Sequence, residues 1–282
     1  NAGCGAPTCS FGRGINDRGD VVGWGVGGIF PGGPKGFKLD KHGTLTVIGF
    51  PGATVTQANG INDNGEIVGL YLLGGPPQAY LRTKDGTYSN VDFPGSISSQ
   101  AWGINSRGQI VGQYDDGSGT HAYLRNQDGT FQSFDFPAGM VASGTLFYTR
   151  FRDINDKGEI VGYYRVTGGN FPVVEIHGFH LDQKGNIHPI DFPVGPQTTE
   201  NFYVTLVHGI NNRGVISGGY IFADTTMGPP LEHGFVRNKK GVFTTVDFPG
   251  ARQTEIYKVS ESGLIVGGAQ DFMLESNAFL SN

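Results

Sequence analysis

Cysteine, long apolar runs and an excess of positive charge are all scarce in this sequence. No stretch approaches the about 18 consecutive apolar residues of a transmembrane helix, so we expect no membrane insertion. The net charge of −5 comes without a basic stripe, which argues against nucleic acid as a partner because a phosphate backbone requires clustered cations. The sequence also has no Asn-x-Ser/Thr acceptor for N-glycosylation.

The two cysteines, Cys4 and Cys9, are too few to scaffold a fold. A local Cys4–Cys9 disulfide is the favoured prediction over free thiols or half of a metal site, because no second cysteine pair could complete a zinc cage. A disulfide implies an oxidising compartment, and the chain begins at Asn1 without methionine, as a secreted protein does after its signal is removed. We therefore expect an extracellular protein.

Several catalytic and cofactor motifs are missing as well. The chain has no Gly-x-Ser-x-Gly elbow, phosphate loop, dinucleotide fingerprint or His-Glu-x-x-His motif. These absences exclude only the enzyme classes that carry such motifs, and we expect no cofactor.

Glycine, by contrast, is abundant, with 48 residues, and it recurs in a repeated motif. Residues 60–69 read "GINDNGEIVG", and related segments lie at 14–23, 103–112, 153–162, 209–218 and 258–267. A second motif, of the type "AYLRTKDGTYSNVDFPG", lies between them and begins a sixth time as "NAFLSN" at the chain end. Each motif reads as two short strands joined by a tight Asn/Asp/Gly turn.

Two hairpins in about 49 residues, repeated, are typical of a β-propeller. We predict an all-β fold: a six-bladed β-propeller of four-stranded antiparallel blades, forming a single domain over residues 1–282. The "GIN" strand would be innermost, and the strand before Asp-Phe-Pro outermost, where proline is tolerated. The last blade lacks an outermost strand in sequence, and we expect the N-terminal segment, residues 1–10, to close it.

The repeats resemble the bacterial extracellular HAF repeat family, named after a His-Ala-Phe strand. The resemblance rests on "HAY" at 121–123 and "HGF" at 177–179 and 233–235, with "KGF", "QAY" and "NAF" as departures, and it covers nearly the whole chain. It implies secretion and a propeller-like fold, not a reaction.

Length variation is confined to one set of connections. The hairpin turns are nearly constant, whereas insertions are expected as loops at 24–36, 137–151, 165–177, 194–208 and 221–233. Alternating strand direction puts these loops on the face opposite the turns. Variable loops on a rigid scaffold commonly carry binding or catalysis, although drift on an idle surface is the alternative.

Residues that vary among the repeats point to a site at the channel mouth on that face. The position before each "GIN" holds Arg13, Asn59, Trp102, Arg152, His208 and Tyr257, and the position two residues earlier holds Phe11, Gln57, Gln100, Arg150, Leu206 and Glu255. Strand alternation points both series to the same side, giving two stacked rings. Packing between blades or holding channel water is the alternative role.

Arginine and aromatic residues in these rings suit an anionic sugar. Guanidinium groups bind carboxylate or sulfate in bidentate fashion, and Trp102 and Tyr257 could stack on a sugar ring. We predict a secreted recognition protein that binds an acidic carbohydrate or another anionic ligand, with a protein partner second. The expected ligand-binding residues are Arg13, Gln57, Asn59, Gln100, Trp102, Arg150, Arg152, His208, Glu255 and Tyr257.

Two alternatives remain open. A polysaccharide lyase or hydrolase acting on uronate-containing glycan could use His208, Tyr257 and Glu255 as catalytic residues beside the arginines. A structural, self-assembling extracellular protein is the second alternative.

We predict no metal site. The three histidines His121, His177 and His233 occupy the same repeat position in different blades, which keeps them apart and favours a strand-edge hydrogen bond in each. The segment "DDGSG" at 115–119 lacks the ligand series of a calcium loop and reads as a turn.

Overall fold

The computed structural model describes residues 9–141, 144–167, 175–193, 201–224, 231–270 and 276–281. These residues form β-strands and one short 3₁₀ helix, η1 (Ala138–Met140). Within the same ranges, no helix is long and apolar enough to cross a membrane. The predicted all-β class is therefore confirmed.

Antiparallel pairing follows the sequence repeat, and we number the repeat units 1 to 6. Strands pair in chain order within each unit. Unit 1 contains β1 (Cys9–Ile15), β2 (Val21–Gly27), β3 (Phe30–Leu39) and β4 (Leu45–Ile48); unit 2 contains β5 (Val55–Ile61), β6 (Ile67–Leu72), β7 (Gln78–Arg82) and β8 (Tyr88–Asn90). Unit 3 contains β9 (Ser98–Ile104), β10 (Ile110–Asp115), β11 (Thr120–Arg125) and β12 (Phe131–Phe134); unit 4 contains β13 (Thr145–Ile154), β14 (Ile160–Thr167), β15 (Glu175–Leu181) and β16 (Ile187–Ile190). Unit 5 contains β17 (Asn201–Ile210), β18 (Ile216–Asp224), β19 (Leu231–Arg237) and β20 (Phe243–Thr245), and unit 6 contains β21 (Gln253–Val259), β22 (Ile265–Gln270) and β23 (Ser276–Ser281).

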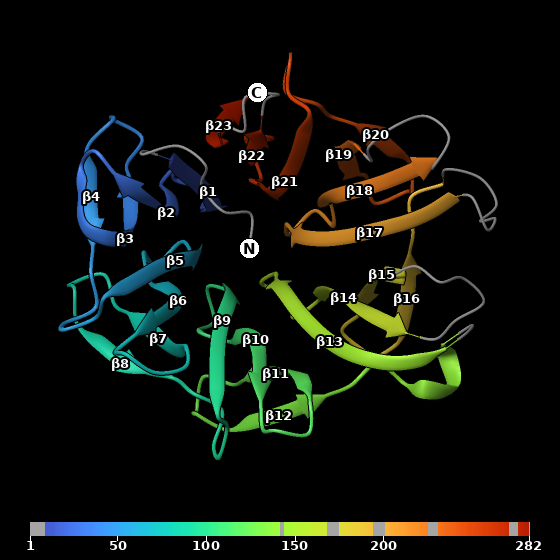
Figure 1. Ribbon diagram of the computed structural model, residues 1–282, viewed down its shortest axis with the longest axis horizontal. Helices are drawn as coiled ribbons and strands as arrows, with labels where there is room; N and C mark the ends of the chain where they lie inside the picture. Colours follow the sequence, from blue (N-terminus) through green and yellow to red (C-terminus); the bar gives the residue numbers. More distant parts are fainter. Residues whose placement is uncertain are drawn as a thin grey trace.

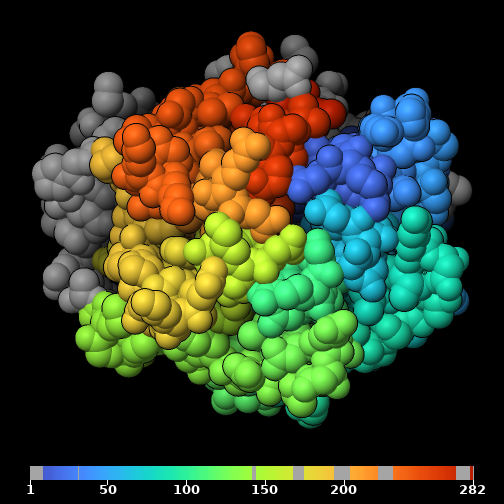
Figure 2. All heavy atoms as spheres, turned by 180° about the vertical axis from the view of Figure 1, so that it is seen from behind, coloured from blue at the N-terminus to red at the C-terminus, as the bar shows by residue number. Residues whose placement is uncertain are grey.

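The units follow one another around a common centre, with the first strand of each unit nearest to it (Figure 1). The view from behind has the same order of colours around the centre (Figure 2). β1 lies against β22 and β23, so unit 6 meets unit 1. The pairing does not divide the molecule into six separate sheets: single parallel bridges join units 3 to 6 into one 15-stranded sheet. Unit 6 has three strands in the described part of the chain.

The predicted N-terminal features fall largely outside the described residues. Cys9 and Ser10 pair with Val26 and Gly25 in unit 1. Residues 1–8, which include Cys4, are not described. The Cys4–Cys9 disulfide and the closure of the last unit by residues 1–10 stay predictions.

The "GIN" turns form because asparagine bonds its own backbone. Asn16 Oδ1 accepts the backbone N–H of Arg18 at 3.1 Å and of Asp20 at 2.9 Å, and Gly19 adopts a φ of 82° that other residues avoid. Equivalent bonds recur at Asn62, Asn105, Asn155 and Asn211. The predicted hairpins are confirmed.

The apolar core is divided among the seams between neighbouring units. Between units 1 and 2, for example, Val22 and Ile48 pack against Ile61, Ile67 and Tyr80. Similar clusters fill the next three seams, and another joins Ile15 and Phe37 of unit 1 to Val266 of unit 6. Each unit thus buries its faces only against its neighbours, as repeat architectures do.

The Phe-Pro segment after an outermost strand connects adjacent units. Phe50 stacks on Tyr71 of unit 2 with ring centroids 3.6 Å apart, and its N–H donates to Thr56 Oγ1 at 3.0 Å. Stacked pairs with centroids 3.7–3.8 Å apart recur at Phe93–Tyr114, Phe136–Tyr164 and Phe192–Tyr220. The repeated "DFP" motif therefore fixes the spacing of the units.

Much of the sequence expected to form variable loops is strand, so the loop prediction is wrong over those residues. β13 begins at Thr145, β14 continues to Thr167, β17 begins at Asn201 and β18 continues to Asp224. Segments such as "TLFYTRF" are rich in threonine and aromatic residues, which favour strands and extend them beyond the repeat length.

Candidate functional site

A β-bulge lies at the same place in the first strand of every unit. In unit 1 the register shifts between Gly12 and Gly14, which leaves Arg13 without a partner on β2. The same shift sets apart Asn59, Trp102, Arg152, His208 and Tyr257 in the other units. Because a bulge re-aims the extra residue, each unit directs one side chain toward the centre.

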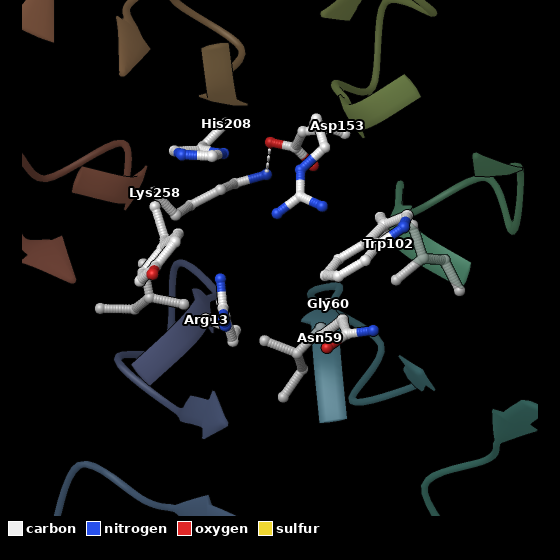
Figure 3. A pocket seen from close by; sticks show the side chains of 13 residues that line it. Arg13, Asn59, Gly60, Trp102, Asp153, His208 and Lys258 are labelled. Carbon is white, nitrogen blue, oxygen red and sulfur yellow. Dashed lines mark hydrogen bonds and ion pairs between the residues drawn. The ribbon is translucent and has the colours of Figure 1, made fainter. Parts of the chain in front are cut away.

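These six residues line one axial pocket, as the sequence predicted for this ring. Figure 3 shows Arg13, Asn59, Trp102 and His208 arranged around it. Asn59 Nδ2 donates to Ala101 O of the next unit at 2.9 Å, which fixes its amide. The six bulge residues that line the pocket come from six different units, so the pocket exists only in the assembled ring.

The second predicted ring widens this pocket into a hollow of about 790 Å³. Its lining includes Phe11, Gln57, Gln100, Arg150, Leu206 and Glu255, together with five of the six bulge residues. The structure thus brings all twelve predicted positions together. Their role in ligand binding stays a prediction.

Close backbone contact explains why glycine is required beside this second ring. A Cβ at Gly69 would lie 1.9 Å from Gln57 O, and a Cβ at Gly162 would lie 2.0 Å from Arg150 O. The "IVG" strand therefore supports the backbone that presents the ring residues, as the repeat predicted.

Three arginines in the hollow have aromatic neighbours and no carboxylate partner. The Arg152 guanidinium carbon lies 3.7 Å from the Trp102 ring centroid, Arg13 lies 4.1 Å from Tyr257, and Arg150 lies 4.2 Å from Tyr148. No ion pair joins these arginines to an acid among the described residues, and the Nε of each is buried without a hydrogen-bond partner there. Stacking on aromatic faces leaves the guanidinium edges to donate to an anion.

Arg152 is the most enclosed of the three, with 8% of its surface exposed. Burial lowers the pKa of its guanidinium, and the charges of Arg13 and Arg150 act in the same direction. An arginine side chain nevertheless stays cationic, so the pocket retains charge that no described group neutralises by contact.

An acidic cluster lies on the wall formed by units 5 and 6. The Tyr257 hydroxyl donates to Glu255 Oε2, and His208 Nε2 lies 3.4 Å from Glu255 Oε1. Burial alone would raise the pKa of Glu255, but His208, Arg13 and Tyr257 together hold it below its ordinary value. Burial lowers the pKa of His208 and raises that of Tyr257, so both are uncharged near neutral pH.

Glu232 of β19 is a neighbour of this cluster; the sequence placed it in the 221–233 insertion on this face but not among the ring residues. Burial, and then the charge of Glu255, raise the pKa of Glu232 well above its ordinary value. The hollow therefore combines three arginines with two carboxyl groups whose pKa values are shifted in opposite directions. It is electropositive within a chain whose net charge is −5.

An ion pair crosses the narrow end of the pocket. Lys258 Nζ contacts Asp153 Oδ2, which also accepts the Ile210 N–H at 2.9 Å (Figure 3). Other units have glycine at the position of Asp153 and Lys258. The pair forms the floor between the hollow and the opposite opening, where the "GIN" turns meet.

The turns around that opposite opening are joined by asparagine. Each Nδ2 donates to the backbone oxygen of the equivalent residue in the next unit, at 3.0–3.2 Å, from Asn16 through Asn62, Asn105, Asn155 and Asn211 to Ser260. The Glu261 N–H donates to Asp17 Oδ1, which returns from unit 6 to unit 1. These bonds assign a structural role to this end.

The histidines of the repeat form separate pairs. Nδ1 of His121, His177 and His233 lies 2.8–3.1 Å from Asp135, Asp191 and Asp247 of the adjoining strand end. The predicted strand-edge hydrogen bonds are confirmed. The described residues contain no group of three or more metal-binding side chains.

Signals for the site residues outside the two predicted rings exist in the repeat alignment. Glu232 stands where other units have Pro34, Pro77, Thr120 and Ile176, and Asp153 and Lys258 replace glycine. A residue that departs from the repeat consensus therefore indicates a site residue also at repeat positions outside the two predicted rings.

Comparisons with known proteins support the fold alone. No family model matches the chain, and no curated protein matches it. Among solved structures, the chain is similar to a putative TolB from Agrobacterium tumefaciens (TM-score 0.59, 12% identity, covering 98% of this chain and 90% of that one). It is also similar to TolB from Acinetobacter baumannii (TM-score 0.53, 12% identity, 90% and 62%) and to Aleuria aurantia lectin in complex with Fucalpha1-6GlcNAc (TM-score 0.52, 10% identity, 97% and 91%). The chain thus has a propeller fold, and the resemblance to HAF repeats stays a prediction.

Proposed function

We propose that this protein is a secreted six-bladed propeller that binds an acidic carbohydrate in the axial hollow. The observation that carries the proposal is the set of Arg13, Arg150 and Arg152, which stack on aromatic rings and have no carboxylate partner in the described chain. Buried cations are costly unless an anion compensates them, so a ligand carboxylate or sulfate would stabilise this arrangement.

The remainder of the hollow suits a sugar. Its lining mixes the aromatic faces of Trp24, Trp102 and Tyr257 with the amides of Gln57 and Gln100. Nε1 of both tryptophans is buried without a partner among the described residues, so the wall retains two unused hydrogen-bond donors. A lectin with a similar fold binds Fucalpha1-6GlcNAc, which supports sugar binding by this architecture at a coarse level.

Titration calorimetry with a short β-1,4-linked oligoglucuronate and the matching neutral oligoglucoside tests the proposal. We expect binding of the acidic sugar only. The substitution Arg150→Gln should weaken it about 10- to 100-fold, because a hydrogen bond to a charged group contributes about 1.5–3 kcal/mol.

Arg82→Gln is the matched control, since Arg82 lies over Tyr88 in an outer strand, away from the hollow. It should bind the acidic sugar as the unsubstituted protein does. Equal affinity for the neutral sugar, or no loss of affinity in Arg150→Gln, would contradict the proposal.

A further inference from the structure

Two carboxyl groups from different strands meet on one wall of the hollow. Glu232 is on β19 and Glu255 is on β21, and both line the cavity. Gly219 of β18 lies between them: a Cβ there would be 3.1 Å from Glu232 Oε1 and 3.5 Å from Glu255 Cγ. The absence of a side chain at Gly219 leaves room for the pair.

The two groups have different surroundings. Glu255 accepts the Tyr257 hydroxyl, lies 3.4 Å from His208 Nε2, and has 26% of its side chain exposed to the hollow. Glu232 Oε1 is buried and meets no hydrogen-bond donor in the described part of the chain. A buried carboxyl oxygen without a donor favours the protonated group, whereas Glu255 has the donors that an anion needs.

We propose that this pair makes the hollow a β-elimination site for glycans that contain a hexuronate, with Glu255 as base and Glu232 as acid. The inference rests on the proposed function, because the arginines must first hold the uronate carboxylate.

The reaction balances without a co-reactant. Glu255 takes the proton from C5, next to the carboxylate, and the electrons of that C–H bond form the C4=C5 double bond. The C4–O bond breaks, and the leaving oxygen takes the proton of Glu232. Transfer of the new proton from Glu255 to its neighbour Glu232 restores the starting state.

Electrostatics favours elimination over glycoside hydrolysis at this site. Removal of the C5 proton places additional negative charge on the uronate carboxylate, which Arg150 and Arg152 would stabilise. Hydrolysis passes through an oxocarbenium-like, positively charged transition state, which the same arginines would destabilise. The cation excess of the hollow therefore discriminates between the two reactions.

The adjacency of the pair also selects a substrate configuration. Acid and base on one wall meet the same face of a bound ring, so the C5 hydrogen and the C4 oxygen must lie on that face. Glucuronate and mannuronate have this arrangement, whereas galacturonate has the two groups on opposite faces. We therefore infer a preference for gluco- or manno-configured uronates.

The test is the ultraviolet absorbance of unsaturated uronate after incubation with polyglucuronate, polymannuronate or polygalacturonate. We expect product from the first or second and not from the third. Glu232→Gln and Glu255→Gln should each lower the turnover rate by about 100-fold or more, the range for loss of a general acid or base. Glu66→Gln, in a turn outside the hollow, should retain full rate.

Calorimetry on the same proteins separates failure of this inference from failure of the proposed function. Glu232→Gln keeps the shape of a protonated carboxyl group, so it should bind oligoglucuronate with unchanged affinity while losing turnover. Binding without any unsaturated product, or full turnover in both glutamine variants, would overturn the inference and leave the binding proposal intact. Absence of binding by the unsubstituted protein would overturn both.

Discussion

At the scale of single residues, the ring contains two kinds of charged group: an ion pair, and arginines without an ion-pair partner among the described residues. Asp153 and Lys258 replace glycine in two units and contact each other across the axis. Arg13, Arg150 and Arg152 have no such partner in the described residues. The first arrangement closes the pocket floor, and the second leaves charge available to a ligand.

The floor pair gives a test of stability. In Lys258→Met, Asp153, which is 5% exposed, is left buried without its cation, so we expect the free energy of unfolding to fall by about 3–5 kcal/mol. The double substitution Asp153→Gly with Lys258→Gly restores the residue found in the other units and should cost less than Lys258→Met. Urea unfolding measures both, and a double variant less stable than Lys258→Met would contradict this role.

The raised pKa of Glu232 predicts a pH dependence of stability. A carboxyl group whose pKa is raised by folding stabilises the native state at low pH, and this contribution is lost as the pH rises from the ordinary range near 4.5 through the raised value. Because glutamine does not titrate, Glu232→Gln should not lose stability in this way as the pH rises. Its melting temperature should match that of the unsubstituted protein at acid pH and exceed it increasingly at higher pH; identical curves throughout would contradict a raised pKa.

At the scale of elements, the bulge in each first strand and the glycine opposite it form one device. The bulge directs a side chain to the axis. The "IVG" glycine, which has no side chain, leaves room for the carbonyl oxygen of the residue two positions before the bulge. Units 1 to 5 repeat this arrangement, and the side chain at the bulge varies among them. A constant scaffold can thereby carry a variable ring.

The glycine part of this device is testable at Gly69. In Gly69→Ala the new methyl group would overlap Gln57 O, so we expect a loss of about 1–3 kcal/mol or more in unfolding free energy. Gly75 has no atom within 4 Å of an added Cβ, and Gly75→Ala should stay within about 0.5 kcal/mol of the unsubstituted protein. Equal stability of the two variants would refute the packing argument.

The sequence predicted these elements because their causes are local. Asn, Gly and alternating residues determine the hairpins, and the "GIN" ring followed from comparing repeats. The bulge at Arg13 was not predictable in this way, since a register shift depends on pairing rather than on periodicity. Glu232 was expected on the long-loop face but not in the ring, because it reaches the hollow from the third strand of a unit. The Asp153–Lys258 pair was missed because its partners lie 105 positions apart.

At the scale of the whole molecule, closure creates the site. The apolar seams, the Phe–Tyr stacks and the asparagine bonds each join one unit to the next, and the Glu261–Asp17 bond joins the last to the first. No single unit contains more than a few residues of the hollow. Any ligand recognised there is therefore recognised by the complete ring.

A crystal structure of the protein with bound oligoglucuronate tests this account most directly. We predict density for the sugar in the axial hollow, with a carboxylate within hydrogen-bonding distance of the Arg150 or Arg152 guanidinium. Sugar bound at another surface, with the hollow containing only solvent, would contradict the account.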